Sequence, residues 1–596
     1  MKLKSSALQA GKFLFLVFIL LQYSCNKTPS DEPGTKPNIL LILTDDQGWG
    51  DLGLHGNPVL ETPNIDKLGM QGVRFDRFYV SPLCAPTRAS LLTGRYHLRT
   101  GTSWVTHRKE VMRSEEKTIA EYLREAGYKT GCFGKWHNGE QYPNDPLGQG
   151  FDEFLGFKGG HLNNYFDSDL CHNNEIVKTS GYITDVLTNA AINFIGENQE
   201  RSFFCYVPYN APHSPFQVPD AFFEKYKSMG LDDRDASVYG MVENLDLNIA
   251  RLLSALDSFQ ITEKTIVIFM TDNGPNGSRY NGDMKGIKGS VDEGGIRVPF
   301  FIRWPGKIQE GILVKEAGRH IDILPTIMEL CDIKYTPVNP LDGRSLIADL
   351  NRPAGQEIRT NIIYSIQNNG EENYYPSSIR TPEYLYVIDQ SRQAHLYDMI
   401  NDPGQKEDMV EKHIQFGDSL DSVLLKWFNE IKTNGIDPLP IPVGYPENPL
   451  TQLPSPESKI SGGLQFAGKM GWANDWIINW KNSADKAVWE MDVNTQGTYE
   501  VFMEYSSGKA SAGKKITVSS GSGKLEYSLS GEVIAPYIES PDRVKRAEVY
   551  ERRWERVPVG ETILEKGLQE LSVQPAEVMD DTAFSVKAVY LELKNH

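Results

Sequence analysis

The chain has 596 residues, of which 40% are hydrophobic and 23% are charged, and its formal net charge at pH 7 is −18. This composition suits a globular protein with a full apolar core, and the length leaves room for roughly two to four domains. The acidic excess argues against general binding to nucleic acid or to anionic membranes, so an anionic ligand would need a local basic pocket.

The N-terminal residues 1–25 predict an export signal. Three lysines precede an apolar run, residues 13–21, that is too short to span a bilayer. A small residue before Cys25 resembles the cleavage site of bacterial lipoproteins, in which the cysteine becomes the lipidated N-terminus. The two residues before that fit the lipoprotein motif poorly, so plain secretion stays open. We expect a protein in the periplasm or on the outer membrane of a bacterium, tethered through residues 26–36, with membrane contact only through a lipid anchor.

Four short apolar runs predict strands that are buried on both faces of a sheet. They span residues 39–43, 130–133, 203–207 and 265–270. Helical patterns alternate with them at residues 118–125, 182–195 and 241–256. This alternation predicts an α/β domain with a large, mostly parallel sheet over residues 37–340. Ligands bind at the carboxyl edge of such sheets, and polar residues follow each of the four runs.

Two smaller units are expected after the α/β domain. Residues 341–437 carry strand-like segments at 361–366, 384–389 and 395–398 and a helix at 419–432. Residues 438–456 are rich in proline and predict a linker. Residues 457–596 alternate short strands with Gly and Ser turns, which predicts an all-β sandwich. Its tryptophans loosely resemble those of a carbohydrate-binding module, but we place the alternative first, that they fill the sandwich core.

Residues 81–96, S-P-L-C-A-P-T-R-A-S-L-L-T-G-R-Y, are the centre of the expected site. Pro86 suits the first turn of a helix, and Gly94 can close that helix. Cys84 would then lie at the positive end of a short helix, with Arg88 one turn away on the same face. The stretch therefore predicts an anion site with a reactive sulfur in its floor. The alternative is a buried structural cysteine in front of an ordinary helix.

Acidic and amide side chains follow the first and last of the four apolar runs. Asp45 and Asp46 follow one, and Asp272 and Asn273 follow the other. Hard divalent cations prefer such oxygen ligands, and the four side chains can converge on one ion if the two strands are neighbours. Taken singly, each pair could instead cap a helix or form a turn.

The combined motifs resemble those of the formylglycine-dependent sulfatases, in the alkaline-phosphatase superfamily and of the bacterial glycan sulfatase type. The matching fragments, in the family's order, are T-D-D-Q-G-W-G, C-x-P-x-R with L-T-G-R, G-K-W-H, A-P-H-S-P, T-D-N-G and K-G-I-K-G. The resemblance covers about residues 37–430. It implies an alkaline-phosphatase-like fold with a small C-terminal sheet subdomain, and it implies hydrolysis of sulfuric esters.

The resemblance also implies cofactors. Cys84 would be oxidised to formylglycine (3-oxoalanine) by a formylglycine-generating or anaerobic sulfatase-maturating enzyme, and its hydrate would attack sulfur to give a covalent sulfo-enzyme. One calcium ion would be bound by Asp45, Asp46, Cys84, Asp272 and Asn273.

Five motif residues receive catalytic roles from the same resemblance. Lys135, Lys288 and Arg88 would hold the sulfuryl oxygens. His213, helped by Lys288, would protonate the leaving alcohol, and His137 would take a proton from the second hydroxyl of the hydrate. A lone histidine or lysine is more often structural, so the prediction depends on the whole set.

The expected substrate is a sulfated glycan, cut at an exposed galactose or N-acetylgalactosamine sulfate. Candidates for contacting the sugar are His161, Asn163, Asn164, His172, Arg279 and Asp283. An ordinary solvated loop is an equal alternative for these residues. Two other functions stay open at this stage: a phosphonate or phosphate monoester hydrolase of the same superfamily, and a non-catalytic surface protein that binds glycans through its sandwich.

Overall fold

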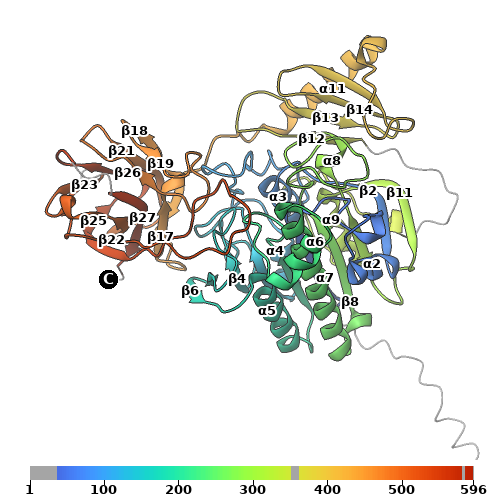
Figure 1. Ribbon diagram of the computed structural model, residues 1–596, viewed down its shortest axis with the longest axis horizontal. Helices are drawn as coiled ribbons and strands as arrows, with labels where there is room; N and C mark the ends of the chain where they lie inside the picture. The colour runs from blue at the N-terminus through green and yellow to red at the C-terminus, as the bar shows by residue number, and fades with distance from the viewer. Residues whose placement is uncertain (1–35, 351–361, 522, 580–583, 595–596) are drawn as a thin grey trace, which may run out of the picture. The chain divides into compact units, whose positions relative to one another are not determined.

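Figure 1 shows the computed structural model, which describes residues 36–350, 362–521, 523–579 and 584–594. Pro37–His596 form one compact unit. The predicted signal, residues 1–25, and all but the last residue of the predicted tether lie outside the described residues. Within the described residues, no helix is both long enough and apolar enough to cross a bilayer.

An 11-stranded sheet forms the centre of the α/β part. In spatial order its strands are β11 (Ile312–Arg319), β2 (Val73–Tyr79), β10 (Phe300–Arg303), β8 (Thr265–Thr271), β1 (Asn38–Thr44), β7 (Phe203–Pro208), β3 (Lys129–Lys135), β4 (Glu153–Phe157), β5 (Asp169–His172) and β6 (Glu175–Lys178), with β9 (Arg297–Val298) beside β2. The central strands β8, β1, β7, β3 and β4 are parallel, and β9, β10, β5 and β6 add antiparallel pairs. The four predicted strands are four of these central five, so the predicted α/β class with a mostly parallel core is confirmed.

Helices cover both faces of this sheet because its central strands are apolar on both sides. Alternate residues of β1 enter different cores: Ile39 and Leu41 pack in one, and Leu40 and Ile42 pack in the other. The first core includes α3 (Cys84–Thr93), α4 (Ile119–Glu125), α9 (Ile323–Leu330) and the end of α10 (Ile347–Leu350). The second includes α2 (Pro63–Met70), α5 (Ile183–Glu197), α6 (Asp220–Ser228) and α7 (Asp233–Ser258). Each fully buried aliphatic side chain contributes roughly 1.5–3 kcal/mol to this packing.

A second, antiparallel sheet follows, as the sequence predicts. Its strands in order are β12 (Ile363–Ile366), β13 (Ser377–Arg380), β14 (Tyr384–Ile388) and β15 (Ala394–Asp398). The amphipathic helix α11 (Ile414–Ile431) packs Leu424 and Phe428 against it. Residue 361, where the first of these strands is predicted to begin, lies outside the described residues.

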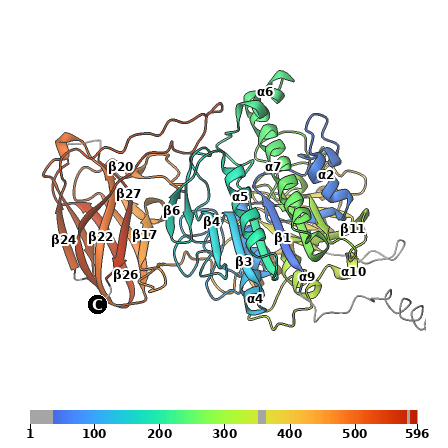
Figure 2. The same cartoon turned by 90° about the horizontal axis from the view of Figure 1, so that it is seen from below.

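The C-terminal part is a β-sandwich of two sheets that face each other (Figure 2). One sheet contains β16 (Ile441–Val443), β18 (Lys459–Ser461), β21 (Lys486–Val493), β23 (Lys515–Ser520), β24 (Gly523–Ser528) and β26 (Gly567–Pro575). The other contains β17 (Leu450–Pro454), β19 (Gln465–Phe466), β20 (Ile477–Ile478), β22 (Gly497–Ser506), β25 (Arg556–Leu564) and β27 (Ser585–Leu593). Trp480 and Trp489 are fully buried between the sheets, which confirms the core role for these two tryptophans.

The predicted linker, residues 438–456, is not a linker in the structure. It contains β16, which pairs with β21, and β17, which pairs with β27, so each sandwich sheet takes a strand from it. Its prolines are compatible with this pairing because a strand at the edge of a sheet needs hydrogen-bond donors on one side only. Pro442 lies in β16, the edge strand of its sheet.

Candidate active site

The ends of two neighbouring strands bring the predicted metal ligands together. β1 and β8 are parallel, with Thr44 opposite Thr271, so the residues that follow these threonines emerge side by side. The Asn273 amide donates to Asp46 Oδ1 at 2.8 Å, and the Asp46 backbone N–H donates to Asp272 Oδ1 at 3.2 Å. All of these side chains are fully buried. The expected convergence of the two motifs is therefore seen.

Helix α3 presents Cys84 to this cluster. The helix begins at Cys84 and ends at Thr93, and Gly94 closes it with φ 69°, as the sequence predicts. The Cys84 sulfur and one carboxylate oxygen each of Asp45 and Asp272 all lie within 4.8 Å of one another. Burial raises the pKa of the Cys84 thiol, so the unmodified side chain is held neutral.

Each carboxylate of the cluster faces a cation from a different motif. The pairs are Arg88 Nη2–Asp272 Oδ2 at 2.8 Å, Lys135 Nζ–Asp45 Oδ2 at 2.6 Å and Lys288 Nζ–Asp46 Oδ1 at 2.6 Å. Such close pairing is what allows charges to remain ionised away from water.

The cations decide the protonation of the cluster. Burial acts to raise the pKa of Asp45 and Asp46, but Lys135 and Lys288 outweigh it and hold both pKa values below their ordinary range. Asp272 differs, because burial and the neighbouring Asp45 charge raise its pKa to about 7 despite its contact with Arg88.

Arg88 has no exposed surface and all of its contacts are inside the cluster. Its Nε and Nη2 donate to Asp272 Oδ2, and Nη1 donates to the Lys135 carbonyl at 2.8 Å. It therefore fixes Asp272 and the end of β3 relative to each other. This placement gives Arg88 a positioning role, and its expected contact with a sulfuryl oxygen stays a prediction.

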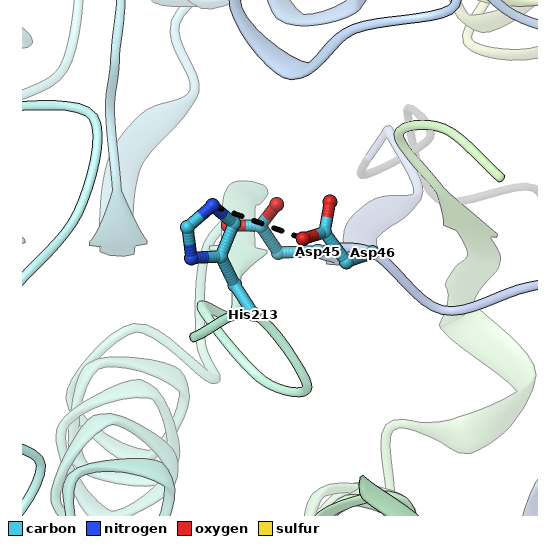
Figure 3. Close-up of side chains that lie close together, drawn as sticks. All are labelled: Asp45, Asp46 and His213. Atoms are coloured by element: carbon cyan, nitrogen blue, oxygen red, sulfur yellow. Dashed lines mark ion pairs between the residues drawn. The ribbon is translucent and has the colours of Figure 1, made fainter. Parts of the chain in front are cut away.

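Two histidines lie beside the acidic cluster. Figure 3 shows the His213 ring turned toward Asp45 and Asp46, with Nε2 3.8 Å from Asp46 Oδ2. His137 donates its Nε2 hydrogen to the Val105 carbonyl at 2.9 Å, since a carbonyl can only accept, and its Nδ1 is buried without a partner in the described chain. Burial lowers the pKa of both histidines, which favours the neutral rings.

The cluster contains oxygens that fit a metal ion. Asp45 Oδ1, Asp46 Oδ2 and Asn273 Oδ1 are buried, and no hydrogen-bond donor reaches them from the described residues. A buried acceptor left without a partner costs roughly 1–3 kcal/mol, which a bound cation would offset. Carboxylate and amide oxygens are the donors that calcium prefers. The residues present therefore fit a calcium ion.

Of the six predicted sugar-contacting residues, His161 lies beside His213, and Asn163 is two residues further along the same segment. The His161 ring is parallel to that of His213, with 6.5 Å between ring centres. His161 Nε2 and both polar atoms of the Asn163 amide are buried, and the described chain supplies no partner to any of them. Asn164 is turned to its own loop, where its Oδ1 accepts from the Phe166 N–H at 3.4 Å.

The other three predicted sugar-contacting residues are placed differently. Arg279 donates two hydrogen bonds to the Asp51 carboxylate and one to the Asp46 carbonyl, at 2.9 Å. It therefore holds the segment that follows β1 in place. His172 is exposed on β5 and faces Glu153 at 3.9 Å, because antiparallel pairing of β4 and β5 carries it toward the outer part of the sheet. Asp283 is exposed in a turn with φ 57°.

The chain matches known proteins over the region that builds this site. Residues 37–333 match the family model described as Sulfatase, and residues 288–428 match the model described as N-sulphoglucosamine sulphohydrolase, C-terminal. The chain is 32% identical over 366 residues to the N-acetylgalactosamine-6-sulfatase of Mus musculus, covering 55% of this chain and 68% of that protein. The chain belongs to the sulfatase family. Members of this family are sulfuric ester hydrolases.

Other relatives agree with this sulfatase assignment. The N-acetylgalactosamine-6-sulfatase of Canis lupus familiaris is 34% identical over 350 residues, covering 52% of this chain and 65% of that protein, slightly under two thirds of its length. Among solved structures, Ps i-CgsB is 32% identical with a TM-score of 0.61, covering 66% of this chain and 92% of that chain. The two curated relatives cover 52% and 55% of this chain and the solved structure covers 66%, so between about a third and a half of this chain has no counterpart in each match.

The sequence motifs did not point to Glu548, a charged residue beside the site. Ser214, next to His213, donates to the carboxylate of Glu548, which belongs to the C-terminal sandwich. The two residues are 334 positions apart, so no local motif joins them. The one available signal is the charged run of residues 542–556, D-R-V-K-R-A-E-V-Y-E-R-R-W-E-R, within a domain otherwise made of short strands.

Proposed function

We propose that this sulfatase removes sulfate from a sulfated glycan, acting at a terminal galactose- or N-acetylgalactosamine-type sugar. The main support for this reaction is the position of the Cys84 sulfur, within 4.8 Å of two carboxylate oxygens. The site is buried and holds three acceptor oxygens without a hydrogen-bond partner among the described residues. The sugar class is supported by similarity to N-acetylgalactosamine-6-sulfatases. Ps i-CgsB, also similar, has been crystallised in complex with k-i-k-neocarrahexaose.

Two groups would complete the site. Formylglycine made from Cys84 would supply the nucleophile, and calcium at Asp45, Asp46, Asp272 and Asn273 would supply positive charge to the sulfuryl oxygens. Lys135 and Lys288 add two further positive charges at the same place. A sulfate ester carries negative charge on its oxygens, so these lysines would orient it over Cys84.

The leaving alcohol would depart on the side of His213 and Lys288. The His213 and Lys288 side chains are 12% and 16% exposed. The side chains of Lys135, Asp45 and Asp46 have no exposed surface. The opening of the site is therefore on their side. His213 donates its Nδ1 hydrogen to the Ser214 carbonyl at 2.7 Å, so only the doubly protonated ring has a hydrogen on Nε2. The nearby Asp46 charge acts to raise the pKa of His213 and favours that form, and the bound ester would add to it. Nε2 would then give its proton to the leaving oxygen, with Lys288 stabilising the developing negative charge.

His137 would act in the second half of the reaction, when sulfate is released. Its Nε2 hydrogen is committed to the Val105 carbonyl, so Nδ1 is the nitrogen able to accept a proton. Burial lowers its pKa and keeps the ring neutral, as a base requires. His137 would take the proton whose removal releases sulfate.

The first test is the mass of the tryptic peptide that contains Cys84, from protein purified from its native host, together with turnover by Cys84→Ala. Formylglycine replaces sulfur by oxygen with loss of two hydrogens. We expect that mass, and we expect the variant to lose at least about a thousandfold in kcat/KM because the nucleophile is gone. Cys132→Ala is the matched control, since Cys132 is also buried but lies inside β3. An unmodified thiol in active protein would contradict the proposal.

The second test is removal of calcium. Chelation is expected to abolish sulfate release, and calcium is expected to restore it better than magnesium, because the site offers protein oxygens rather than room for retained waters. Calcium binding measured by calorimetry should be lost in Asn273→Ala, which removes one of the unpartnered oxygens. Full activity in the chelated protein would exclude the metal role.

A phosphonate monoester hydrolase remains the nearest alternative enzyme. The enzyme from Agrobacterium radiobacter is 21% identical with a TM-score of 0.50, which shows a shared fold alone. Turnover of matched sulfate and phosphate or phosphonate esters separates the two, and we expect the sulfate ester to be preferred. Glycan binding without turnover, unaffected by Cys84→Ala, would instead favour a non-catalytic binding protein.

We also propose that the protein is exported as a lipoprotein and matured by an enzyme that oxidises Cys84. The support is the N-terminal sequence, with its lysines, apolar run and Cys25. Metabolic labelling with a fatty acid should mark the wild type and spare Cys25→Ala. Export of an unlabelled wild type would show plain secretion.

A further inference from the structure

A long connection of the C-terminal sandwich lies against the sulfatase part. It comprises residues 529–555 between β24 and β25, and we call it the arm. Figures 1 and 2 both show it, in red-brown, running from the sandwich toward the α/β part. Its tip contacts the loop that follows β7, the same loop that carries His213.

Several hydrogen bonds fix the arm in this position. Gln217 donates to Asp542 Oδ1 at 2.7 Å and to Ser540 Oγ at 3.0 Å. Arg543 donates to the Val218 carbonyl at 2.8 Å. These contacts tie the arm to the loop just after His213, so the arm has a defined position beside the site.

A buried arginine of the arm reaches the predicted sugar-contacting loop. The Arg546 side chain is 1% exposed and paired with Asp542, with Nε 2.6 Å from Oδ2. Its Nη1 donates to the Asn163 carbonyl. A second loop of the sandwich supports the same segment, because the Asn474 amide donates to the His161 carbonyl at 2.8 Å. The sandwich therefore sets the backbone of the residues whose side chains have unpartnered polar atoms.

Glu548 places a negative charge at this point. Ser214 donates to its carboxylate, and the charge acts on both His161 and His213. His213 is on the open side of the site, so Glu548, bonded to the neighbouring Ser214, lies on the side where the leaving sugar is proposed to be. A carboxylate there can accept hydrogen bonds from hydroxyls, and it repels other anions.

We propose that Glu548, carried by the arm of the sandwich, is a specificity-determining residue of the sulfatase. It accepts a hydrogen bond from a hydroxyl of the sugar that bears the scissile sulfate, and it disfavours a second anionic group, a sulfate or a carboxylate, beside that ester. This inference rests on the proposed function, because it assigns the leaving group to the His213 side. It gives the appended sandwich a part in substrate selection.

The test compares a monosulfated N-acetylgalactosamine with its disulfated counterpart in wild type, Glu548→Gln and Glu539→Gln. Glu539 is on the same arm and is exposed. For Glu548→Gln we expect the ratio of kcat/KM values, monosulfated to disulfated, to fall about tenfold or more, mainly through KM. Glu539→Gln should keep the wild-type ratio, and Glu548→Asp, which keeps the charge, should retain most of it.

A merely structural role of Glu548 would lower the melting temperature and leave the ratio unchanged, and that result overturns the inference. The same ratio is also measured as binding constants in a Cys84→Ala background, which lacks the nucleophile. If the wild type releases no sulfate, the proposed function fails, and a binding ratio that still depends on Glu548 then supports only its role in selecting the bound sugar. If turnover is found and both ratios are insensitive to Glu548, the inference alone fails.

Discussion

Acidic side chains are withdrawn from water in two regions of the molecule, and the two regions balance their charge differently. In the active site, Asp45 and Asp46 each lie 2.6 Å from a lysine. Where the sandwich meets the α/β part, Glu110 and Glu457 line one small cavity. The Arg108–Glu457 contact at 3.4 Å is the only ion pair of these two glutamates within the described chain.

The difference in pairing produces opposite protonation. The lysines hold the pKa of Asp45 and Asp46 below the ordinary range despite burial. At the interface, burial dominates and raises the pKa of Glu457 to about 8 and that of Glu110 to about 7. The active site therefore keeps Asp45 and Asp46 ionised, as metal binding requires, whereas burial at the interface favours the neutral form of Glu110 and Glu457.

The largest effect is expected from removing one cation of the active site. Arg88→Ala leaves Asp272 buried without its partner, which should lower the free energy of unfolding by about 3–5 kcal/mol. The measurement is urea unfolding in the presence of a chelator, followed by the midpoint and the slope. Arg88→Lys, which keeps a positive charge, should recover part of the loss. If the urea midpoint of Arg88→Ala equalled that of the wild type, the pairing with Arg88 would not stabilise the buried Asp272, and the two regions would not differ in the way described.

A smaller effect, with a defined pH window, is expected at the interface. The folded-state pKa of Glu457, about 8, exceeds the ordinary value of 4.5, so the folded protein binds the proton more tightly than the unfolded chain. Stability from this group is then complete below pH 4.5 and falls as the pH rises toward 8.

Glu457→Gln mimics the neutral form and should flatten that pH dependence. Relative to wild type, the free energy of unfolding of the variant should be higher by about 2 kcal/mol at pH 8.5 and almost unchanged at pH 4.5. Urea unfolding across pH 4–9 measures this difference. Gln141 donates to Glu457 Oε2 at 3.1 Å, and the new side chain can keep its amide oxygen in the same place to accept that bond. A pH-independent difference between variant and wild type would show that Glu457 does not titrate on unfolding.

The same contrast explains what the sequence could predict. The metal motifs and the G-K-W-H motif lie at the carboxyl ends of β1, β8 and β3, where parallel pairing brings strand ends together. Cys84 and Arg88 are on one helix whose start and end are marked by Pro86 and Gly94. For this part of the site, local patterns determine the geometry, so the convergence was predictable.

Contacts with the sandwich were not predictable in this way. Glu548 meets Ser214, and Arg108 meets Glu457, only because the sandwich packs against the α/β part, and no periodicity in the sequence predicts that packing. The segment 438–456 was misassigned for a related reason. Proline content argues against a central strand, but β16 and β17 lie where one row of backbone donors is not needed.

The smallest effect defines the baseline against which both buried regions are judged. Asp233 at the start of α7 pairs with Lys227 at 2.7 Å, but the two side chains are 52% and 43% exposed. Water already stabilises both charges, so Lys227→Ala should change the free energy of unfolding by no more than about 0.5 kcal/mol, and added salt should reduce even that. Urea midpoints at low and high salt measure it. A loss comparable to that of Arg88→Ala would mean that burial does not control the strength of these pairs, and the contrast between the two regions would need another cause.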